Sequence, residues 1–195
     1  MKTIGVLGLQ GAVQEHVSHI DAVGCKSVVV KTVEQLEHID GLIIPGGEST
    51  TMRRFIDQYG FLEPLMKFGK QKPIYGTCAG MVLLANRLAG GEKPHLQLID
   101  ITVKRNAFGR QRDSFEAKLN VKAMETPFPA VFIRAPFVEE AGANVEILAE
   151  YEGHIVAARQ DHILVTAFHP ELTDDTRFMK LFLQMVKLNK SASTL

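Results

Sequence analysis

The chain has 195 residues, of which 46% are hydrophobic and 23% are charged, and its formal net charge is zero. These values fit one globular domain that can fold without disulfides, and they give no broad basic field for nucleic acid or an anionic membrane. No apolar run approaches the roughly 20 residues that a membrane helix needs, so we expect neither nucleic acid nor membrane as a partner.

The first half of the chain alternates predicted strands with predicted helices. Apolar, β-rich runs predict strands at 3–9, 28–30, 41–45 and 73–75. Helical spacing of apolar residues predicts helices at 12–23, 49–58 and 63–68, with a short one at 32–37. The strands are continuously apolar rather than alternating, which is typical of a parallel sheet covered on both faces.

The second half has a different pattern. Segments 96–104 and 115–121 alternate apolar and polar residues as antiparallel or edge strands do, and short strands are predicted at 130–134, 145–151, 154–159 and 163–168. An amphipathic helix at 174–188 precedes a flexible tail at 189–195. The sequence therefore predicts a single domain over 1–195. Its fold class is a three-layer α/β/α arrangement, with a mostly parallel mixed sheet, helices on both faces and a small antiparallel appendage.

The most informative segment is the Gly-Thr-Cys-Ala-Gly run that surrounds Cys78, between an apolar strand and a helix-forming run. Glycines two residues before and two after Cys78 leave room for a backbone that a Cβ would obstruct. This is the pattern of a nucleophile elbow with sulfur in place of the usual serine oxygen. A helix beginning just after Cys78 would point its free N–H groups at the sulfur. The alternative is that Cys78 is a small core residue.

A base for this thiol is offered by His169, which ends an apolar strand at the sheet edge where α/β sites lie. Glu171 follows two residues later and would lie on the same side of an extended chain. Its carboxylate could accept an imidazole N–H and hold the ring in the useful tautomer. Alone, the pair could be a surface histidine beside an unrelated glutamate. After an elbow cysteine, it predicts a thiol triad.

A third motif, Pro-Gly-Gly-Glu-Ser, follows the strand at 41–45. Gly46 and Gly47 could present backbone N–H groups to an oxyanion, and a helix beginning at Ser49 adds positive potential. A plain tight turn is an equal alternative. A phosphate-binding loop is disfavoured because no Gly-Lys-Ser/Thr follows.

The remaining histidines and cysteines predict no metal site and no cofactor. There is no Cys-x-x-Cys pair, and a free thiol suits a reducing cytoplasm, where we expect the protein to be located. Cys25 reads as a structural thiol. We expect the histidines on or beside predicted helices to be solvated: His16, His19 and His38.

These three motifs, in this order, resemble those of the class I (triad) glutamine amidotransferases. The resemblance extends over nearly the whole chain. Segments 5–11, 41–50, 105–111 and 132–136 are similar to the branch of the family that serves as the glutaminase subunit of pyridoxal 5′-phosphate (vitamin B6) synthase. The elbow and His-Pro-Glu belong to the whole class, whereas 41–50 and 105–111 point to this branch.

The resemblance implies a glutaminase that converts L-glutamine to L-glutamate and ammonia. It assigns the triad to Cys78, His169 and Glu171. The oxyanion donors would be the N–H groups of Gly47 and Ala79. The implied substrate-binding residues are Gly46, Gly47, Glu48, Arg105, Ile133 and Arg134. Without the resemblance, Arg105 and Arg134 would read as solvated strand-edge cations.

The resemblance also implies a partner, a separate (β/α)₈-barrel synthase subunit that consumes the ammonia within a large hetero-oligomer. Gln10 is linked in the family to activation by that partner. Three alternatives remain open: the glutaminase subunit of another biosynthetic amidotransferase, another thiol or ester hydrolase on an α/β fold, and a non-catalytic binding module.

Overall fold

The computed structural model describes residues 1–108, 113–122 and 124–192. Its centre is a mixed sheet with strand order β2-β1-β3-β4-β12-β11-β9-β6-β5, in which β10 pairs with β11. The parallel part comprises β1 (Thr3–Leu7), β2 (Lys26–Val30), β3 (Gly41–Ile44), β4 (Ile74–Thr77) and β12 (Ile163–Thr166). The part with antiparallel pairings comprises β6 (Ile99–Lys104), β9 (Phe137–Ala141), β10 (Glu146–Tyr151) and β11 (His154–Gln160). At the edge, β5 (Ala85–Leu88) runs parallel to β6.

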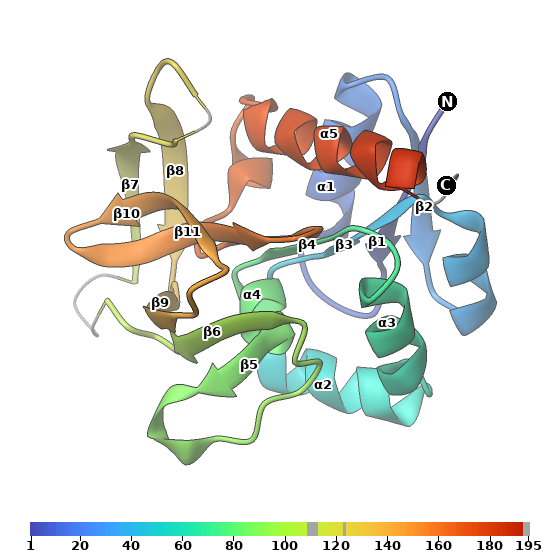
Figure 1. The fold of residues 1–195 in the computed structure, drawn as a ribbon, viewed down its shortest axis with the longest axis horizontal. Helices are drawn as coiled ribbons and strands as arrows, with labels where there is room; N and C mark the ends of the chain where they lie inside the picture. Colours follow the sequence, from blue (N-terminus) through green and yellow to red (C-terminus); the bar gives the residue numbers. More distant parts are fainter. Residues whose placement is uncertain (109–112, 123, 193–195) are drawn as a thin grey trace.

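Helices cover both faces of the parallel part (Figure 1). One face carries α1 (Val13–Ala22) and α5 (Arg177–Ala192), and the other carries α2 (Ser49–Gln58), α3 (Leu62–Gly69) and α4 (Ala79–Leu84). Short 3₁₀ turns are η1 (Val33–His38), η2 (Ala89–Gly91) and η3 (Pro170–Leu172). Every residue of β3, β4 and β12 is buried, as the continuously apolar runs predicted. The three-layer prediction is confirmed.

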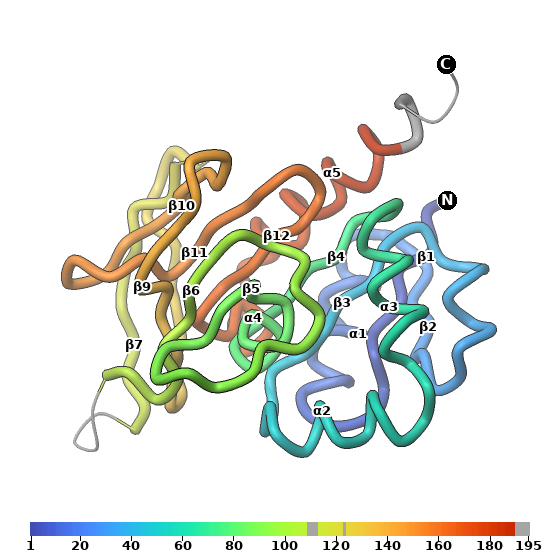
Figure 2. The backbone as a smooth tube through the Cα atoms, turned by 60° about the horizontal axis from the view of Figure 1, so that its bottom comes forward, coloured from blue at the N-terminus to red at the C-terminus, as the bar shows by residue number. Residues whose placement is uncertain are grey.

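A separate two-stranded antiparallel sheet, β7 (Ser114–Leu119) with β8 (Phe128–Ile133), forms the predicted appendage. It lies beside β10 and β11 at the end of the molecule away from β2 (Figures 1 and 2). Its inner face is aromatic, since Phe115 stacks on Phe132 with ring centroids 4.6 Å apart. The appendage therefore packs through an apolar core, and the end of β8 is held against the main sheet.

Three elements differ from the sequence-based expectations. Strand β5, which begins directly after α4 ends at Leu84, was not predicted. Strand β9 was not predicted; it forms because it pairs with both β6 and β11, and such tertiary pairing outweighs a weak local pattern. Helix α5 begins at Arg177 and continues to Ala192, into the segment proposed as a tail.

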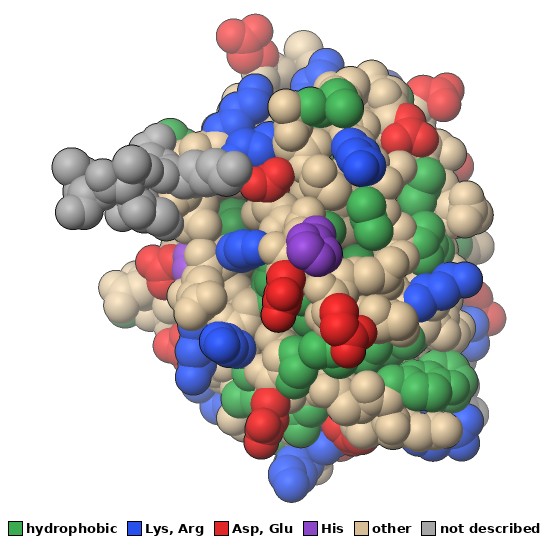
Figure 3. Space-filling view, turned by 90° about the vertical axis from the view of Figure 1, so that its right-hand side faces the viewer, with side chains coloured by type: hydrophobic (Ala, Val, Ile, Leu, Met, Phe, Trp, Pro, Cys, Tyr) green, Lys and Arg blue, Asp and Glu red, His purple; other side chains and the backbone are tan. Residues whose placement is uncertain are grey.

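The surface is electrostatically mixed. On the face shown in Figure 3, basic and acidic side chains are interspersed with apolar ones, in keeping with the zero formal net charge. None of the helices in the described part of the chain is long and apolar enough to cross a membrane.

Candidate active site

Cys78 lies in the turn between β4 and α4, with φ 48° and ψ −103°. Positive φ is uncommon for a residue with a side chain, and such strain is concentrated at functional sites. The turn is held because the Cys78 backbone N–H donates to the carbonyl of Thr166 on β12, at 2.8 Å. The sulfur is buried apart from 8% exposure, and it lies 3.9 Å from the carbonyl oxygen of Ile133. This is the predicted elbow geometry.

The flanking glycines are required by close backbone packing. A Cβ on Gly76 would lie 2.6 Å from Leu84 Cδ1 and 2.7 Å from the carbonyl carbon of Gly80. A Cβ on Gly80 would collide with the carbonyl oxygen of Ile44 on β3. Only glycine fits at either position, so the elbow sits tightly against β3.

His169 reaches the same edge of the sheet because β12 lies beside β4 in parallel register, with Thr166 opposite Thr77. Its backbone N–H donates to Val131 on β8 at 2.8 Å. Its Nδ1–H donates to Glu171 Oε1 at 2.7 Å, and both side chains are buried. The carboxylate therefore fixes the orientation of the ring, as the His-x-Glu spacing predicted.

The electrostatics of this group favour a protonated imidazole. Burial disfavours the charge on His169, but hydrogen bonds with Cys78 and Glu171 and their negative charges outweigh it and raise the pKa of His169 to about 10. Burial likewise disfavours the charge on Glu171, yet the neighbouring His16 and His169 keep the pKa of its carboxyl below the usual value. At neutral pH the pocket therefore holds an imidazolium between the Glu171 carboxylate and the Cys78 sulfur.

Gly46 packs against both Cys78 and the His169 ring. A Cβ on this residue would collide with the His169 ring, including Nδ1 at 2.9 Å, and would lie 3.4 Å from Cys78 Cβ. The loop that follows β3 therefore brings the Gly46–Gly47 backbone directly against the two reactive side chains. A substrate carbonyl attacked by the sulfur would lie beside this backbone, where oxyanion donors are needed.

The loop after β1 packs against the same glycines. Gln10 Oε1 accepts the backbone N–H of Glu48 at 2.9 Å, and the Ala12 N–H donates to the Gly46 carbonyl at 3.0 Å. Gly11 has φ 99°, and a Cβ there would collide with the Gly46 carbonyl oxygen. The orientation of the Gly46–Gly47 peptide is thus tied to the loop after β1.

A cavity of about 410 Å³ opens at this point, within the size range of small-molecule sites. Its wall includes every sequence-predicted site residue except Glu171, which lies behind His169: Gln10, Gly46, Gly47, Glu48, Cys78, Ala79, Arg105, Ile133, Arg134 and His169. Asn106, which the sequence analysis quoted only as part of 105–111, also lines it, whereas 109–111 lie outside the described residues.

Two charged residues of the wall, Arg105 and Glu48, already have partners. Arg105 Nη1 donates to Glu92 Oε2 at 2.9 Å, and its side chain is 32% exposed. The Glu48 carboxylate caps α2 by accepting the N–H groups of Thr50 and Thr51, and these bonds outweigh burial and lower its pKa. Arg134 has φ 41° at the end of β8, which turns the chain toward the cavity mouth.

Comparison with known proteins identifies the family. The model of the SNO glutamine amidotransferase family matches residues 6–188. The chain belongs to the SNO glutamine amidotransferase family. It is 62% identical to the pyridoxal 5′-phosphate synthase subunit PdxT of Geobacillus sp. (strain WCH70), covering 98% of this chain and 100% of that protein. It is 61% identical to the PdxT of Geobacillus kaustophilus, over 98% of each chain.

Solved structures agree with this assignment. A crystal structure of a glutamine amidotransferase superposes with a TM-score of 0.90 at 40% identity, covering 94% of this chain and 98% of that one. PurLQS from Thermotoga maritima matches with a TM-score of 0.62 at 15% identity, over 95% and 98% of the two chains, which shows a shared fold. The α/β fold is therefore that of glutamine amidotransferases.

Two histidines of this family member are placed differently from the sequence-based expectation. His16 and His19 on α1 are buried, at 1% and 8% exposure, whereas both were expected to be solvated. His16 Nε2 lies 3.1 Å from Thr77 Oγ1, and His19 Nε2 lies 2.6 Å from the Thr173 carbonyl oxygen. The sequence did indicate that His16 is buried, because it falls three residues after Val13 and four before Ile20, on the same apolar face of the helix. His38 is exposed, as expected.

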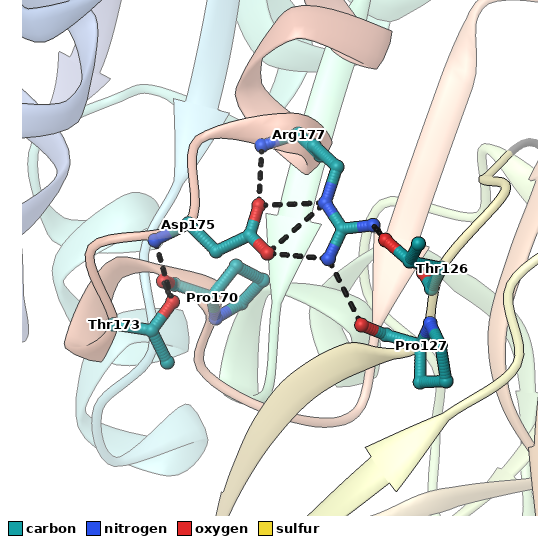
Figure 4. A network of polar contacts seen from close by, with 6 residues as sticks. All are labelled: Thr126, Pro127, Pro170, Thr173, Asp175 and Arg177. Carbon is teal, nitrogen blue, oxygen red and sulfur yellow. Dashed lines mark hydrogen bonds and ion pairs between the residues drawn. The ribbon is translucent and has the colours of Figure 1, made fainter.

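The segment after Glu171 is anchored by the polar network of Figure 4. Thr173 Oγ1 donates to the Pro170 carbonyl at 2.9 Å and accepts the Asp175 N–H at 3.2 Å. Arg177 holds the Asp175 carboxylate through Nε and Nη2 and donates to the carbonyls of Thr126 and Pro127, just before β8. The network ties the His169–Glu171 segment to β8, which also lines the cavity.

The described residues contain no group of three or more histidine, cysteine, aspartate or glutamate side chains that could hold a metal ion.

Proposed function

We propose that this chain is the glutaminase subunit of a pyridoxal 5′-phosphate synthase, in which it hydrolyses L-glutamine and supplies ammonia for vitamin B6 biosynthesis. One observation carries the chemistry: an elbow thiol and a carboxylate-held imidazole line one cavity, and Gly46 packs against both residues. The relatives at about 60% identity over nearly the full chain, named as PdxT subunits, support the biosynthetic role.

In this proposal His169 takes the proton of the Cys78 thiol, and the resulting thiolate attacks the side-chain carboxamide carbon of glutamine. A C–S bond forms as the carbonyl π bond opens. The negative charge that develops on the carbonyl oxygen is held by the N–H groups of Gly47 and Ala79. The His169 imidazolium then gives its proton to the departing nitrogen as the C–N bond breaks, which releases ammonia and leaves a γ-glutamyl thioester. The protonated state favoured at His169 supports this role as an acid.

In the second half of the reaction, His169 acts as a base instead of an acid. Having lost a proton to ammonia, neutral His169 accepts one from water, whose oxygen attacks the thioester carbon. The C–S bond breaks, glutamate leaves and the thiolate–imidazolium pair is restored. Glu171 keeps the ring oriented throughout, through its 2.7 Å bond to Nδ1.

Substrate recognition in this proposal rests on the cavity wall. A guanidinium such as that of Arg105 makes charge-assisted hydrogen bonds to a carboxylate, which suits the α-carboxylate of glutamine. Its present partner, Glu92, is exposed and exchangeable. Glu48 lines the substrate site in the family, and in this proposal its carboxylate faces the α-ammonium of glutamine while it caps α2. Gly46, Ile133 and Arg134 complete the set.

The proposal includes a (β/α)₈-barrel synthase partner, a large hetero-oligomer and a cytoplasmic location, all of which remain predictions. The contact of Gln10 with the Glu48 N–H supports a link between partner docking and the oxyanion loop. If docking completes the oxyanion hole, the isolated chain is a poor glutaminase, because one missing donor costs roughly 100- to 1,000-fold in rate.

The test is glutamate release measured for the chain alone and with the synthase subunit. We expect strong activation by the partner, and labelling of Cys78 by a glutamine-like chloroketone that Cys78→Ala abolishes. Equal rates with and without the partner would refute the gating. Labelling at another residue, or none, would favour the non-catalytic module, and activation only by a different synthase would favour another amidotransferase.

A further inference from the structure

One buried side chain contacts both catalytic segments without lining the cavity. His16 Nε2 lies 3.1 Å from Thr77 Oγ1 and 3.6 Å from Glu171 Oε1, and the side chain is 1% exposed. Thr77 immediately precedes the nucleophile, and Glu171 orients His169. A single imidazole on α1 therefore bridges the end of β4 and the segment after β12.

The hydrogen-bonding pattern selects one tautomer of this imidazole. Within the described residues, His16 Nδ1 has no hydrogen-bond partner, so a proton on Nδ1 would be a buried, unpaired donor. It would also leave the Nε2 lone pair facing the Glu171 carboxylate. A proton on Nε2 points instead at two oxygen atoms, one neutral and one charged. This arrangement favours an Nε2–H that donates to Thr77 Oγ1 and lies beside the Glu171 carboxylate.

The surroundings keep this donor neutral. Burial lowers the pKa of His16 below the ordinary value, although Glu171 opposes the effect. The other titratable groups that act on it are His19 and Glu15 from α1 and His169 from the segment after β12. A neutral His16 leaves the Glu171 charge available to His169, whereas a cation would compete for it.

We propose that His16 is a positioning residue of the triad, whose Nε2–H fixes the Glu171 carboxylate relative to the Thr77–Cys78 turn. The proposal rests on the proposed function. The second carboxylate oxygen of Glu171, Oε2, is buried and has no hydrogen-bond partner in the part of the chain that the structure describes. Its contacts at Oε1 therefore matter for the ionised carboxylate, and there His169 Nδ1 lies at 2.7 Å and His16 Nε2 at 3.6 Å.

Loss of the His16 N–H donor should change the pH dependence of Cys78 reactivity, which a general loss of stability would not do. Without His16, the buried Glu171 anion has one stabilising neighbour fewer, so Glu171 takes up a proton at a higher pH. A protonated Glu171 no longer supports the imidazolium beside Cys78. We therefore expect the acidic limb of Cys78 reactivity to move to higher pH, while the reactivity at high pH stays close to that of the unchanged chain.

The experiment compares His16→Leu, which removes the donor, with His16→Gln, whose side-chain amide retains an N–H at a similar reach. His19→Leu is the matched control, because His19 is buried on the same helix but contacts the Thr173 carbonyl instead of Glu171. The rate of iodoacetamide alkylation is followed from pH 5 to 10. Mass spectrometry quantifies the Cys78 adduct separately from that of Cys25, and thermal unfolding is recorded for each variant.

For His16→Leu we expect Cys78 to be alkylated about tenfold more slowly near pH 6, with a change below about threefold near pH 9. This corresponds to a shift of about one pH unit in the acidic limb of the rate–pH profile. His16→Gln restores most of the difference, and His19→Leu lowers the unfolding temperature without moving the limb. An unmoved limb in folded His16→Leu, no recovery in His16→Gln, or an equal displacement in His19→Leu overturns the proposal. If His16→Leu does not fold, His16→Met, which is flexible and also lacks a donor, takes its place.

Glutaminase kinetics with the synthase subunit complete the test. We expect His16→Leu to lower kcat at pH 6 more than at pH 9, with KM within about threefold, since His16 does not reach the cavity. Alkylation needs neither glutamine nor a partner. A displaced limb together with no glutaminase activity in any chain would therefore reject the proposed function and leave the role of His16 standing.

Discussion

Substitution Glu171→Gln tests how the imidazolium is held. The amide has nearly the same shape as the carboxylate but carries no charge, and it replaces the group that accepts the His169 Nδ1–H at 2.7 Å. Burial of His169 remains, while the hydrogen bond weakens and the Coulombic attraction disappears. We expect the pKa of His169 to fall from about 10 back toward its ordinary value of 6.5.

The expected loss of rate in Glu171→Gln follows from the size of the His169 pKa shift. A rise from 6.5 to about 10 corresponds to roughly 5 kcal/mol in favour of the imidazolium, at about 1.4 kcal/mol for each tenfold change in proton affinity. Glu171 and Cys78 share this stabilisation. If Glu171 supplies about half of it, roughly 2.5 kcal/mol, its loss lowers the rate of glutamine hydrolysis by about a hundredfold.

The assay is a pH titration of the ¹⁵N-labelled histidine rings by NMR, with the His169 signal assigned from its absence in His169→Asn. Glutamate release with the synthase subunit is measured on the same proteins. Glu140→Gln, which neutralises an exposed carboxylate on β9, is the matched control and should change neither quantity. A His169 pKa that stays near 10 in Glu171→Gln, or a rate within threefold of the unchanged chain, would refute this account.

Three further predictions concern the glycine loop, the cysteines and the arginine network. Gly46→Ala should fold, with a loss of about 1–3 kcal/mol in the free energy of unfolding. Because its methyl group pushes against the His169 ring, we expect glutamine hydrolysis to fall at least a hundredfold. Near-normal turnover would show that the loop lies farther from His169. Cys25→Ser should leave turnover within a few-fold, whereas Cys78→Ser should abolish it; similar losses would mean that the nucleophile is wrongly assigned. Arg177→Leu should lower the free energy of unfolding by about 1–3 kcal/mol in urea titrations, because it leaves Asp175 and the Thr126 and Pro127 carbonyls without their donor. An unchanged urea midpoint would contradict a structural role for the network.

The fold and the reactive groups were largely predictable because their signals are local. Continuous apolar runs identified the buried parallel strands, and the spacing of glycines around Cys78 identified the elbow. The pairing of His169 with Glu171 required only that the two side chains lie two residues apart. In each case the sequence contains both the residue and the reason for its position.

The remaining features depend on contacts between distant segments. Nothing in the sequence of 137–141 shows that it will become β9 between β6 and β11. The need for glycine at position 46 arises from the His169 ring, which comes from the far end of the chain. His16 was read as a solvated helical residue because histidine is polar. Its position on the Val13–Ile20 stripe indicated burial, but the identity of its partner, Glu171, appears only in three dimensions.

Strand β12 is inserted between β4 and β11, yet it is the last strand of the chain. A nascent polypeptide emerging from the ribosome will therefore carry its thiol long before the segment that brings the imidazole exists. In the proposed mechanism, a chain that lacks residues 163–171 has no imidazole beside its thiol and therefore cannot attack glutamine. We expect premature termination upstream of these residues to give inactive fragments that release no ammonia.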